Sequence, residues 1–166
     1  VFFFFFCVAG CGKSSLGQSL AAALQLPLIE GDDHHSAASR TKMSQGVPLT
    51  DADREGWLTQ LGQLLQARPE GAVLTCSALK KAYRDRLRAA CPSLRFAFLQ
   101  IDRAQAEARV KARAQTHFFS AALVDSQFAT LESPTGEPGV LTLDATLPLS
   151  ALEQQACAWL TTLEAA

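Results

Sequence analysis

The sequence predicts an α/β fold in which helices cover both faces of a parallel sheet. Short apolar runs alternate along the chain with segments of helical periodicity. Each apolar run is nearly continuous, which is typical of strands buried on both faces. Polar clusters directly follow three of these runs, and open parallel sheets bind ligands at the carboxyl ends of their strands. With 166 residues and no internal repeat, the chain is expected to form one domain, residues 1–166.

The N-terminal part of the chain alternates strand and helix. Residues 1–7 are continuously apolar and predict the central strand, although five consecutive phenylalanines leave little room for rings on both of its faces. Residues 15–26 have helical periodicity and end at a proline. Residues 26–30 then predict a short strand, and residues 36–45 a helix that a glycine and a proline terminate.

The middle of the chain predicts a long helix, a strand, a basic helix and another strand. Thr50, followed by acidic residues, is expected to cap the long helix, whose apolar stripe faces the core. Residues 72–77 and 95–101 are the strands, and residues 79–90 are the basic helix between them. The apolar stripe consists of Trp57, Leu58, Leu61, Leu64 and Leu65.

The C-terminal part continues the alternation and supplies a fifth strand. A proline- and glycine-rich stretch at 132–139 precedes that strand. The closing helix is expected to be capped near Ser150. The remaining elements are expected as helices at 103–114 and 121–131 with a break at 116–119, a strand at 140–144 and a closing helix at 149–164.

Composition argues against several kinds of partner. The net charge is −1, so the chain lacks the basic excess of a nucleic-acid-binding protein, and no nucleic acid partner is expected. The apolar opening run is shorter than the roughly 20 residues of a membrane helix and lacks the basic start of a signal peptide, so no membrane partner is expected either. The five cysteines are widely spaced and odd in number, which suits reduced thiols in a cytoplasmic protein.

The stretch CVAGCGKSS, residues 7–15, predicts a phosphate-binding loop between a strand and a helix. A glycine-rich bend directs backbone N–H groups into one concavity, the lysine reaches the outer phosphates, and the serine hydroxyl ligates Mg²⁺. Cys7 occupies the position of the first glycine in the full pattern. Cys11 is either a redox-sensitive thiol or a small loop filler, and the second is favoured. The residues assigned to the nucleotide are Gly10, Cys11, Gly12, Lys13, Ser14 and Ser15.

Missing features narrow the chemistry to a small-molecule kinase. The chain contains no asparagine, so it lacks the Asn-Lys-x-Asp guanine reader of a GTPase. The third strand ends in Thr75-Cys76-Ser77 without the acidic residue that a motor ATPase usually has there. A kinase needs a phosphate loop, a carboxylate that faces the acceptor hydroxyl, and cations that close over the phosphoryl group.

Side chains for these kinase roles can be nominated. Asp32 follows the second strand and can take a proton from an attacking hydroxyl, or it is simply a turn residue. Glu30 lies on the same side of the extended chain and can hold Mg²⁺ through water. His35 is expected to hydrogen-bond the substrate, because no other ligand lies at metal-site spacing. Arg109 and Arg113 share a helix face, as cations of a lid or as a solvated basic face.

Five segments together resemble the gluconokinase family of ATP-dependent D-gluconate 6-kinases. They are GCGKSS, GDDHH, KMSQGVPLTDADREGWL, CSALKKAYRDRLR and HFF...LVDSQFATLE, and the resemblance runs from about Val8 to the end of the chain. The segments CSALKKAYRD and SQFATLE are far more specific than the phosphate loop. It implies a three-layer P-loop kinase fold, similar to nucleoside monophosphate kinases, with a five-stranded parallel sheet. It also implies a substrate-side helical region at about 35–60, a lid at about 109–127, ATP and Mg²⁺ as cofactors, and a cytoplasmic homodimer that makes 6-phosphogluconate.

The resemblance also implies residue roles. Lys13, Asp32 and Arg113 would be catalytic, Arg109 and Arg113 would contact the nucleotide, and Ser14 with Glu30 would hold the metal. Arg54 and Arg84 are the bidentate candidates for the gluconate carboxylate. The chain departs from the family at Cys7, at Ser36–Ser39, and by one extra residue before His117. The residues implied to bind gluconate are Asp32, His35, Lys42, Arg54, Ser77, Lys81 and Arg84.

Two other readings remain open. A kinase for shikimate or a nucleoside monophosphate would share the loop and the lid, but not the segment CSALKKAYRD. A non-catalytic nucleotide-binding module would keep Lys13 and need no Asp32.

Overall fold

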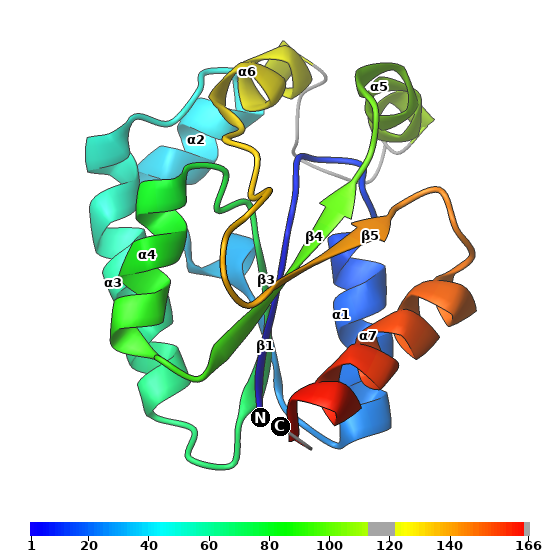
Figure 1. Cartoon of the computed structure of the whole chain (residues 1–166). Coiled ribbons are helices and arrows are strands. Elements are labelled where there is room, and N and C mark those ends of the chain that lie inside the picture. Colours follow the sequence, from blue (N-terminus) through cyan, green and yellow to red (C-terminus); the bar gives the residue numbers. More distant parts are fainter. Residues whose placement is uncertain (113–121, 165–166) are drawn as a thin grey trace.

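A parallel sheet of five strands forms the middle layer of the molecule (Figure 1). The computed structural model describes residues 1–112 and 122–164. The strand order is β2-β3-β1-β4-β5, and every neighbouring pair is parallel. The predicted fold class is confirmed. The strands are β1 (Phe2–Phe6), β2 (Leu28–Glu30), β3 (Ala72–Cys76), β4 (Leu94–Gln100) and β5 (Val140–Asp144).

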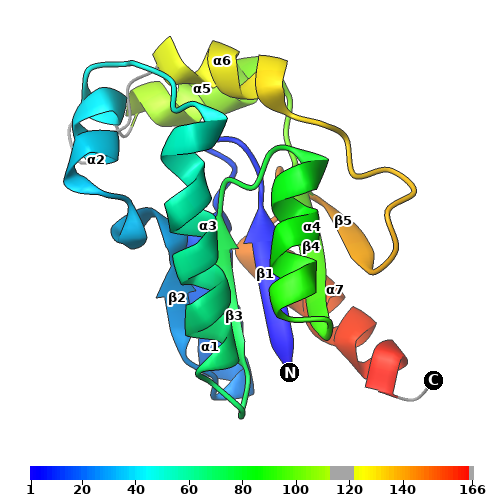
Figure 2. The ribbon, with the colours of Figure 1, turned by 90° about the vertical axis from the view of Figure 1, so that its left-hand side faces the viewer.

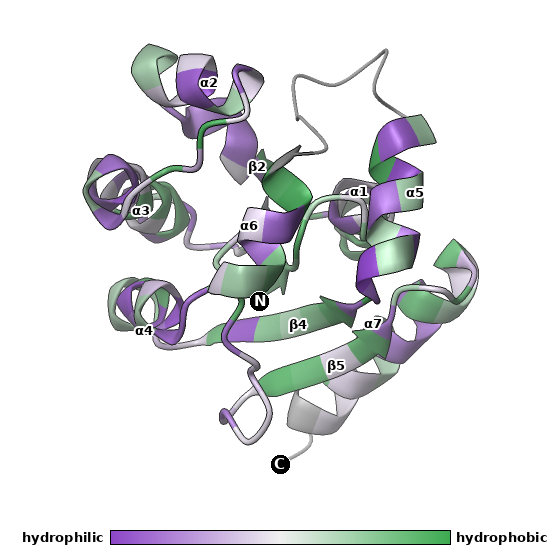
Figure 3. Cartoon of the chain, turned by 90° about the horizontal axis from the view of Figure 1, so that it is seen from above, coloured by the Kyte–Doolittle hydropathy of each residue, from purple (hydrophilic) through white to green (hydrophobic). Residues whose placement is uncertain are grey.

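Helices cover both faces of the sheet and its upper end. Helices α3 and α4 pack on one face and α1 and α7 on the other (Figures 1 and 2). Helices α2, α5 and α6 lie at the carboxyl ends of the strands, the end seen from above in Figure 3. In the described ranges, no helix is long and apolar enough to span a membrane. The helices are α1 (Lys13–Leu24), α2 (Ala37–Ser44), α3 (Asp51–Gln66), α4 (Lys81–Ala90), α5 (Arg103–Ala112), α6 (Ala122–Thr130) and α7 (Leu149–Glu164).

Side-chain caps explain where α2 and α3 begin. Ser36 accepts a hydrogen bond from the Ser39 N–H and so caps α2, at one of the positions where the sequence departs from the gluconokinase pattern that it resembles. Thr50 caps α3 as expected, and Asp53 completes a capping box with it. Between β2 and α2, Gly31–His34 form a 3₁₀ turn, η1. Ser150 lies in the first turn of α7, which begins at Leu149.

The phenylalanine run fits the core, contrary to the expectation that its rings lack room. Phe3 to Phe6 are all fully buried. Successive rings point to opposite faces: Phe3 packs edge-on against Trp159 of α7, and Phe4 packs edge-on against Phe96 of β4. On the face shared by Phe3 and Phe5, the register partners Val73 and Thr75 of β3 and Ala97 of β4 are smaller than phenylalanine, which leaves room for these two rings.

Two helical glycines form a matched test of how closely helix α1 packs against strand β3. A Cβ on Gly17 of α1 would lie 2.4 Å from Cγ2 of Thr75, whereas a Cβ on Gly56 of α3 would meet nothing within 4 Å. We expect Gly17→Ala to destabilise the fold by about 1–3 kcal/mol through overpacking. Gly56→Ala should stabilise it by about 0.5–1 kcal/mol through helix propensity. Urea unfolding measures both, and stabilisation by Gly17→Ala would contradict the close approach of α1 to β3.

Candidate active site

The phosphate loop joins the end of β1 to the start of α1. Gly10 and Gly12 have φ angles of 82° and 92°, a left-handed conformation that favours glycine. A Cβ on Gly10 would also lie 2.7 Å from the carbonyl oxygen of Ala106 in α5. Cys7 is buried, and its φ angle is not positive, so the first loop position does not require glycine here.

Opposite charges meet at the base of the loop. Burial by itself lowers the pKa of Lys13, but negative charge at Cys11 and Asp32 outweighs it, so the pKa lies above its ordinary value. Burial by itself raises the pKa of the Cys11 thiol, but a hydrogen bond with Cys7 and the charges of Lys13 and Arg109 lower it to about 7. The charge of Asp32 therefore acts on the ammonium group of the loop lysine.

The predicted magnesium ligands lie side by side. Ser14 Oγ donates a hydrogen bond to Glu30 Oε2 at 3.1 Å, and Thr75 at the end of β3 donates to the same oxygen. No cluster of three or more His, Cys, Asp or Glu side chains with metal-site geometry occurs in the described part of the chain. A hydroxyl beside a single carboxylate fits Mg²⁺, which usually keeps several waters and relies on substrate phosphates for further ligands.

A small pocket lies at the same end of the sheet. The predicted residues His35, Arg54 and Ser77 line it together. Helix α6 closes another part of the wall. The other lining residues are Met43, Pro48, Leu49, Leu79, Leu123, Ser126, Gln127 and Thr130.

His35 is held as a buried, neutral imidazole. Its ring stacks on Trp57 with centroids 4.2 Å apart, and Trp57 Nε1 donates to the Gly31 carbonyl at 2.7 Å. His35 Nε2 lies 3.9 Å from Asp32 Oδ1. Burial lowers the pKa of His35 to about 4; Asp32 opposes that shift, and Arg54 with another nearby arginine reinforces it. The buried Nδ1 atom has no hydrogen-bond partner among the described residues.

Arg54 has an unused donor in the same pocket. Its Nε is buried and has no partner in the described ranges, and its guanidinium carbon lies 5.7 Å from the centre of the Tyr83 ring. Buried polar atoms without a partner are rare, because each costs about 1–3 kcal/mol. Arg54 and His35 are therefore prepared for a polar ligand.

Two predicted lysines instead have carboxylate partners outside the pocket lining. Lys42 Nζ lies 2.7 Å from Asp53 Oδ1, and this contact is the largest cause of the lowered pKa of Asp53, about 2. Lys81 pairs with Asp85 one turn further along α4. The structure thus does not bring Lys42 and Lys81 together with His35.

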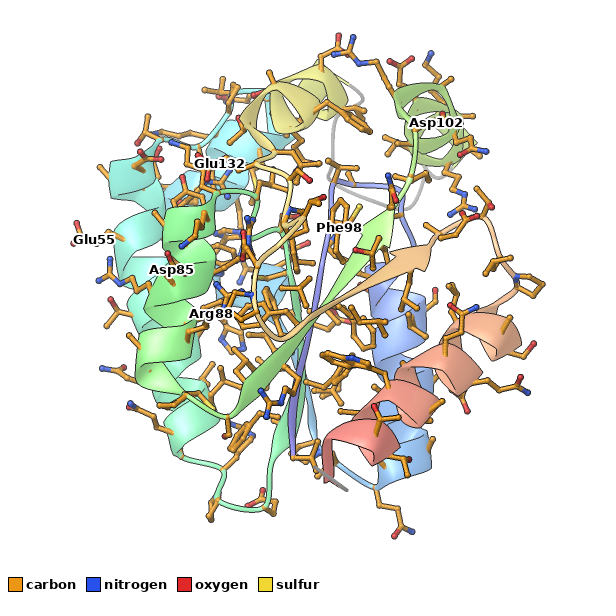
Figure 4. The ribbon with its side chains drawn as sticks, in the orientation of Figure 1. Glu55, Asp85, Arg88, Phe98, Asp102 and Glu132 are labelled. Carbon is orange, nitrogen blue, oxygen red and sulfur yellow. The ribbon has the colours of Figure 1, made fainter. Side chains whose placement is uncertain are left out.

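Arg84 does not line the pocket either, because its N–H groups already donate hydrogen bonds to carbonyl and carboxylate groups of the protein. The side chain is fully buried, with Nη1 donating to the carbonyls of Ala78 and Leu79. Nε and Nη2 bind the Glu137 carboxylate, which also accepts from Arg88 Nη2 at 2.8 Å. Figure 4 labels Arg88 on α4. Arg84 joins α4 to the segment that follows α6.

Arg109 lies against the phosphate loop from α5. Its Nη1 lies 3.4 Å from the Gly10 carbonyl oxygen and 3.5 Å from that of Cys11, and its Nη2 donates to Ala145 at 2.9 Å. Arg113 lies outside the described residues, together with the rest of 113–121 in the lid expected at 109–127. The extra residue before His117 lies outside them too.

Sequence reasoning gave no site role to three residues that the structure places here. Trp57 belonged to an apolar stripe and was expected only in the core. Thr75 ends a strand without an acidic residue and yet orients Glu30. Gln127 lies in SQFATLE, a family-specific segment that by itself indicates no role for it. In the sequence, Thr75 and Gln127 could have been singled out only by their positions near a strand end and in a family-specific segment. Their roles become clear only from the contacts in the fold.

Comparisons with known proteins agree with the geometry. Residues 4–134 match a family described as AAA domain. The chain is 43% identical over 133 residues to the thermosensitive gluconokinase of Escherichia coli (strain K12), covering 78% of this chain and 71% of that protein. It is 42% identical over 138 residues to the gluconokinase of Gluconobacter oxydans (strain 621H), covering 81% and 76%. The crystal structure of a gluconokinase from Sinorhizobium meliloti 1021 superposes with a TM-score of 0.89 at 40% identity, covering 98% and 92%.

The buried His35 predicts a dependence of stability on pH. Its pKa in the fold, about 4, lies below the ordinary value of 6.5, so between these values the unfolded chain binds a proton that the fold does not. Stability from this group is complete above pH 6.5 and is lost as the pH falls toward 4. We expect it to account for about 2 kcal/mol of the difference between pH 7 and pH 5.

Urea unfolding at pH 7 and pH 5 measures this contribution. His35→Gln should reduce the acid loss of stability by about that amount, and the matched variant His34→Gln should leave it unchanged. Equal acid losses in the wild type and His35→Gln would show that His35 is not held neutral by burial.

Proposed function

This chain belongs to the gluconokinase family, and we propose on that premise that it transfers the γ-phosphoryl group of ATP to the 6-hydroxyl of D-gluconate. The products are ADP and 6-phospho-D-gluconate. One observation carries the proposal: the phosphate loop and the Asp32 carboxylate lie at the same end of the sheet as a pocket with buried polar atoms that have no partner among the described residues. A phosphate donor and a polyhydroxy acid acceptor fit such an arrangement.

Asp32 is the proposed base. Its side chain is 36% exposed, so it can reach a bound acceptor, and its negative charge raises the pKa of Lys13. The carboxylate accepts the proton of the 6-hydroxyl as the hydroxyl oxygen attacks the γ-phosphorus. Lys13 stabilises the negative charge on the transferred group. His35, held neutral, adds no second positive charge beside Asp32, which stays available as a proton acceptor.

The acceptor binds in the pocket between α2, α3 and α6. Arg54 pairs with the gluconate carboxylate, because its Nε is the buried donor without a partner there. Ser77 and His35 Nδ1 hydrogen-bond the polyol hydroxyls. Residues 35–60 are the proposed substrate-side region. Arg84 is left out of the contacts to gluconate, since its donors already bind Glu137 and backbone carbonyls.

Nucleotide and metal bind on the loop side. Ser14 would hold Mg²⁺ directly and Glu30 through water, and the ion would supply positive charge against the phosphates. Backbone N–H groups of the loop and the start of α1 receive the phosphates. Arg109 and Arg113 are the proposed cations of the lid. A homodimer in the cytoplasm is also proposed, on the family resemblance alone.

A coupled assay of ADP release tests the function. Purified enzyme with Mg²⁺ and ATP should release ADP rapidly with D-gluconate, and only at background rate with shikimate, AMP or no acceptor. Asp32→Asn should keep nucleotide affinity and lose about 10²- to 10⁴-fold in kcat, the usual contribution of a general base. Its neighbour Asp33 is exposed, so Asp33→Asn is the matched control and should retain activity.

Two outcomes count against the proposal. Equal ADP release with every acceptor, or with none, would reject gluconate as the substrate. Full activity in Asp32→Asn would instead keep gluconate as the substrate and reject Asp32 as the base.

A further inference from the structure

One buried hydrogen bond joins the phosphate loop to a helix far away in the sequence. The Ala9 N–H donates to Gln127 Oε1 at 2.6 Å, and both residues are buried. A buried backbone N–H requires a partner, and neighbouring strands or turns usually supply it. Here a side chain of α6, 118 positions along the chain, supplies it. The loop conformation therefore depends on the position of α6.

The same residue lines the proposed acceptor pocket. Gln127 contributes to the wall together with Leu123, Ser126 and Thr130 of α6, opposite His35 and other polar groups of the substrate side. Leu123 and the neighbouring Val124 are buried and anchor the helix. One side chain thus contacts both the loop that receives the phosphates and the cavity that receives the acceptor.

We propose that Gln127 is a positioning residue that fixes the phosphate loop relative to the acceptor pocket and thereby couples the binding of nucleotide and acceptor. The inference rests on the proposed function. An acceptor packed against α6 stabilises the helix position in which Gln127 binds the Ala9 N–H. That position also fixes the loop for phosphates, so each ligand strengthens the binding of the other, as reciprocity requires.

The hydrogen bond can be removed with little change in shape. Gln127→Met keeps the length and apolar stem but has no carbonyl oxygen for the Ala9 N–H. Gln127→Asn keeps the amide and is shorter by one methylene, so it does not reach the loop from the same backbone position. Asp125→Asn is the matched control, because Asp125 is an exposed residue of the same helix whose carboxylate lies 3.3 Å from Arg103.

Calorimetric titration measures the coupling directly. The dissociation constant of a non-hydrolysable ATP analogue with Mg²⁺ is determined with and without saturating D-gluconate. In the wild type and Asp125→Asn, gluconate should lower the dissociation constant of the analogue by about 5- to 150-fold, the usual range of coupling between sites. In Gln127→Met and Gln127→Asn this ratio should fall to about one. If Gln127 had a merely structural role, its variants would raise the dissociation constant of the analogue equally with and without gluconate. The ratio of the two constants would then stay at the wild-type value.

The outcomes separate this inference from the proposed function. A wild-type ratio retained in either folded Gln127 variant overturns the inference, as does a wild-type ratio of one with gluconate bound. Failure of gluconate to bind the wild type removes the proposed function and the inference together. If Gln127→Met does not fold, Gln127→Asn decides alone by the same criterion.

Discussion

The conformation of the phosphate loop is the constraint on which the rest of this structure depends. Gly10 and Gly12 take left-handed angles, and α5 approaches Gly10 so closely that no side chain fits. The loop directly follows β1, the central strand, whose phenylalanines Phe3 to Phe6 are buried on both faces of the sheet. A buried strand and a tightly packed turn restrict the backbone of the loop, which is the kind of preorganisation that phosphoryl transfer uses.

At the carboxyl end of the sheet, the phosphate-loop side and the pocket side of the site differ in their electrostatics. On the loop side, Lys13 keeps its charge because Cys11 and Asp32 lie near it. On the pocket side, burial keeps His35 neutral, while Arg54 Nε has no partner within residues 1–112 and 122–164. Asp32 belongs to both parts, since its charge acts on Lys13 and on His35. This shared position explains why a proton acceptor and a phosphate-binding cation can serve one reaction.

The sequence predicted the fold class correctly, and it nominated two loop-side residues that the structure places in contact, because both inferences depend on local patterns. Continuous apolar runs identify the strands, and Ser14 and Glu30 meet because consecutive strand ends share one edge of a parallel sheet. Pairing between side chains is not local, and here the prediction was weaker. An arginine in a family-specific segment looks the same whether it binds a substrate or, like Arg84, a buried glutamate. The link between Gln127 and Ala9 was likewise invisible without the fold.

The central claim is that Lys13 and Asp32 act on one acceptor hydroxyl. A crystal structure of the complex with Mg²⁺, a non-hydrolysable ATP analogue and D-gluconate tests it most directly. The account predicts the 6-hydroxyl oxygen between the Asp32 carboxylate and the γ-phosphorus, with Lys13 on the γ-phosphate. Gluconate bound in another cavity, or in the pocket with its 6-hydroxyl directed away from Asp32, would contradict it.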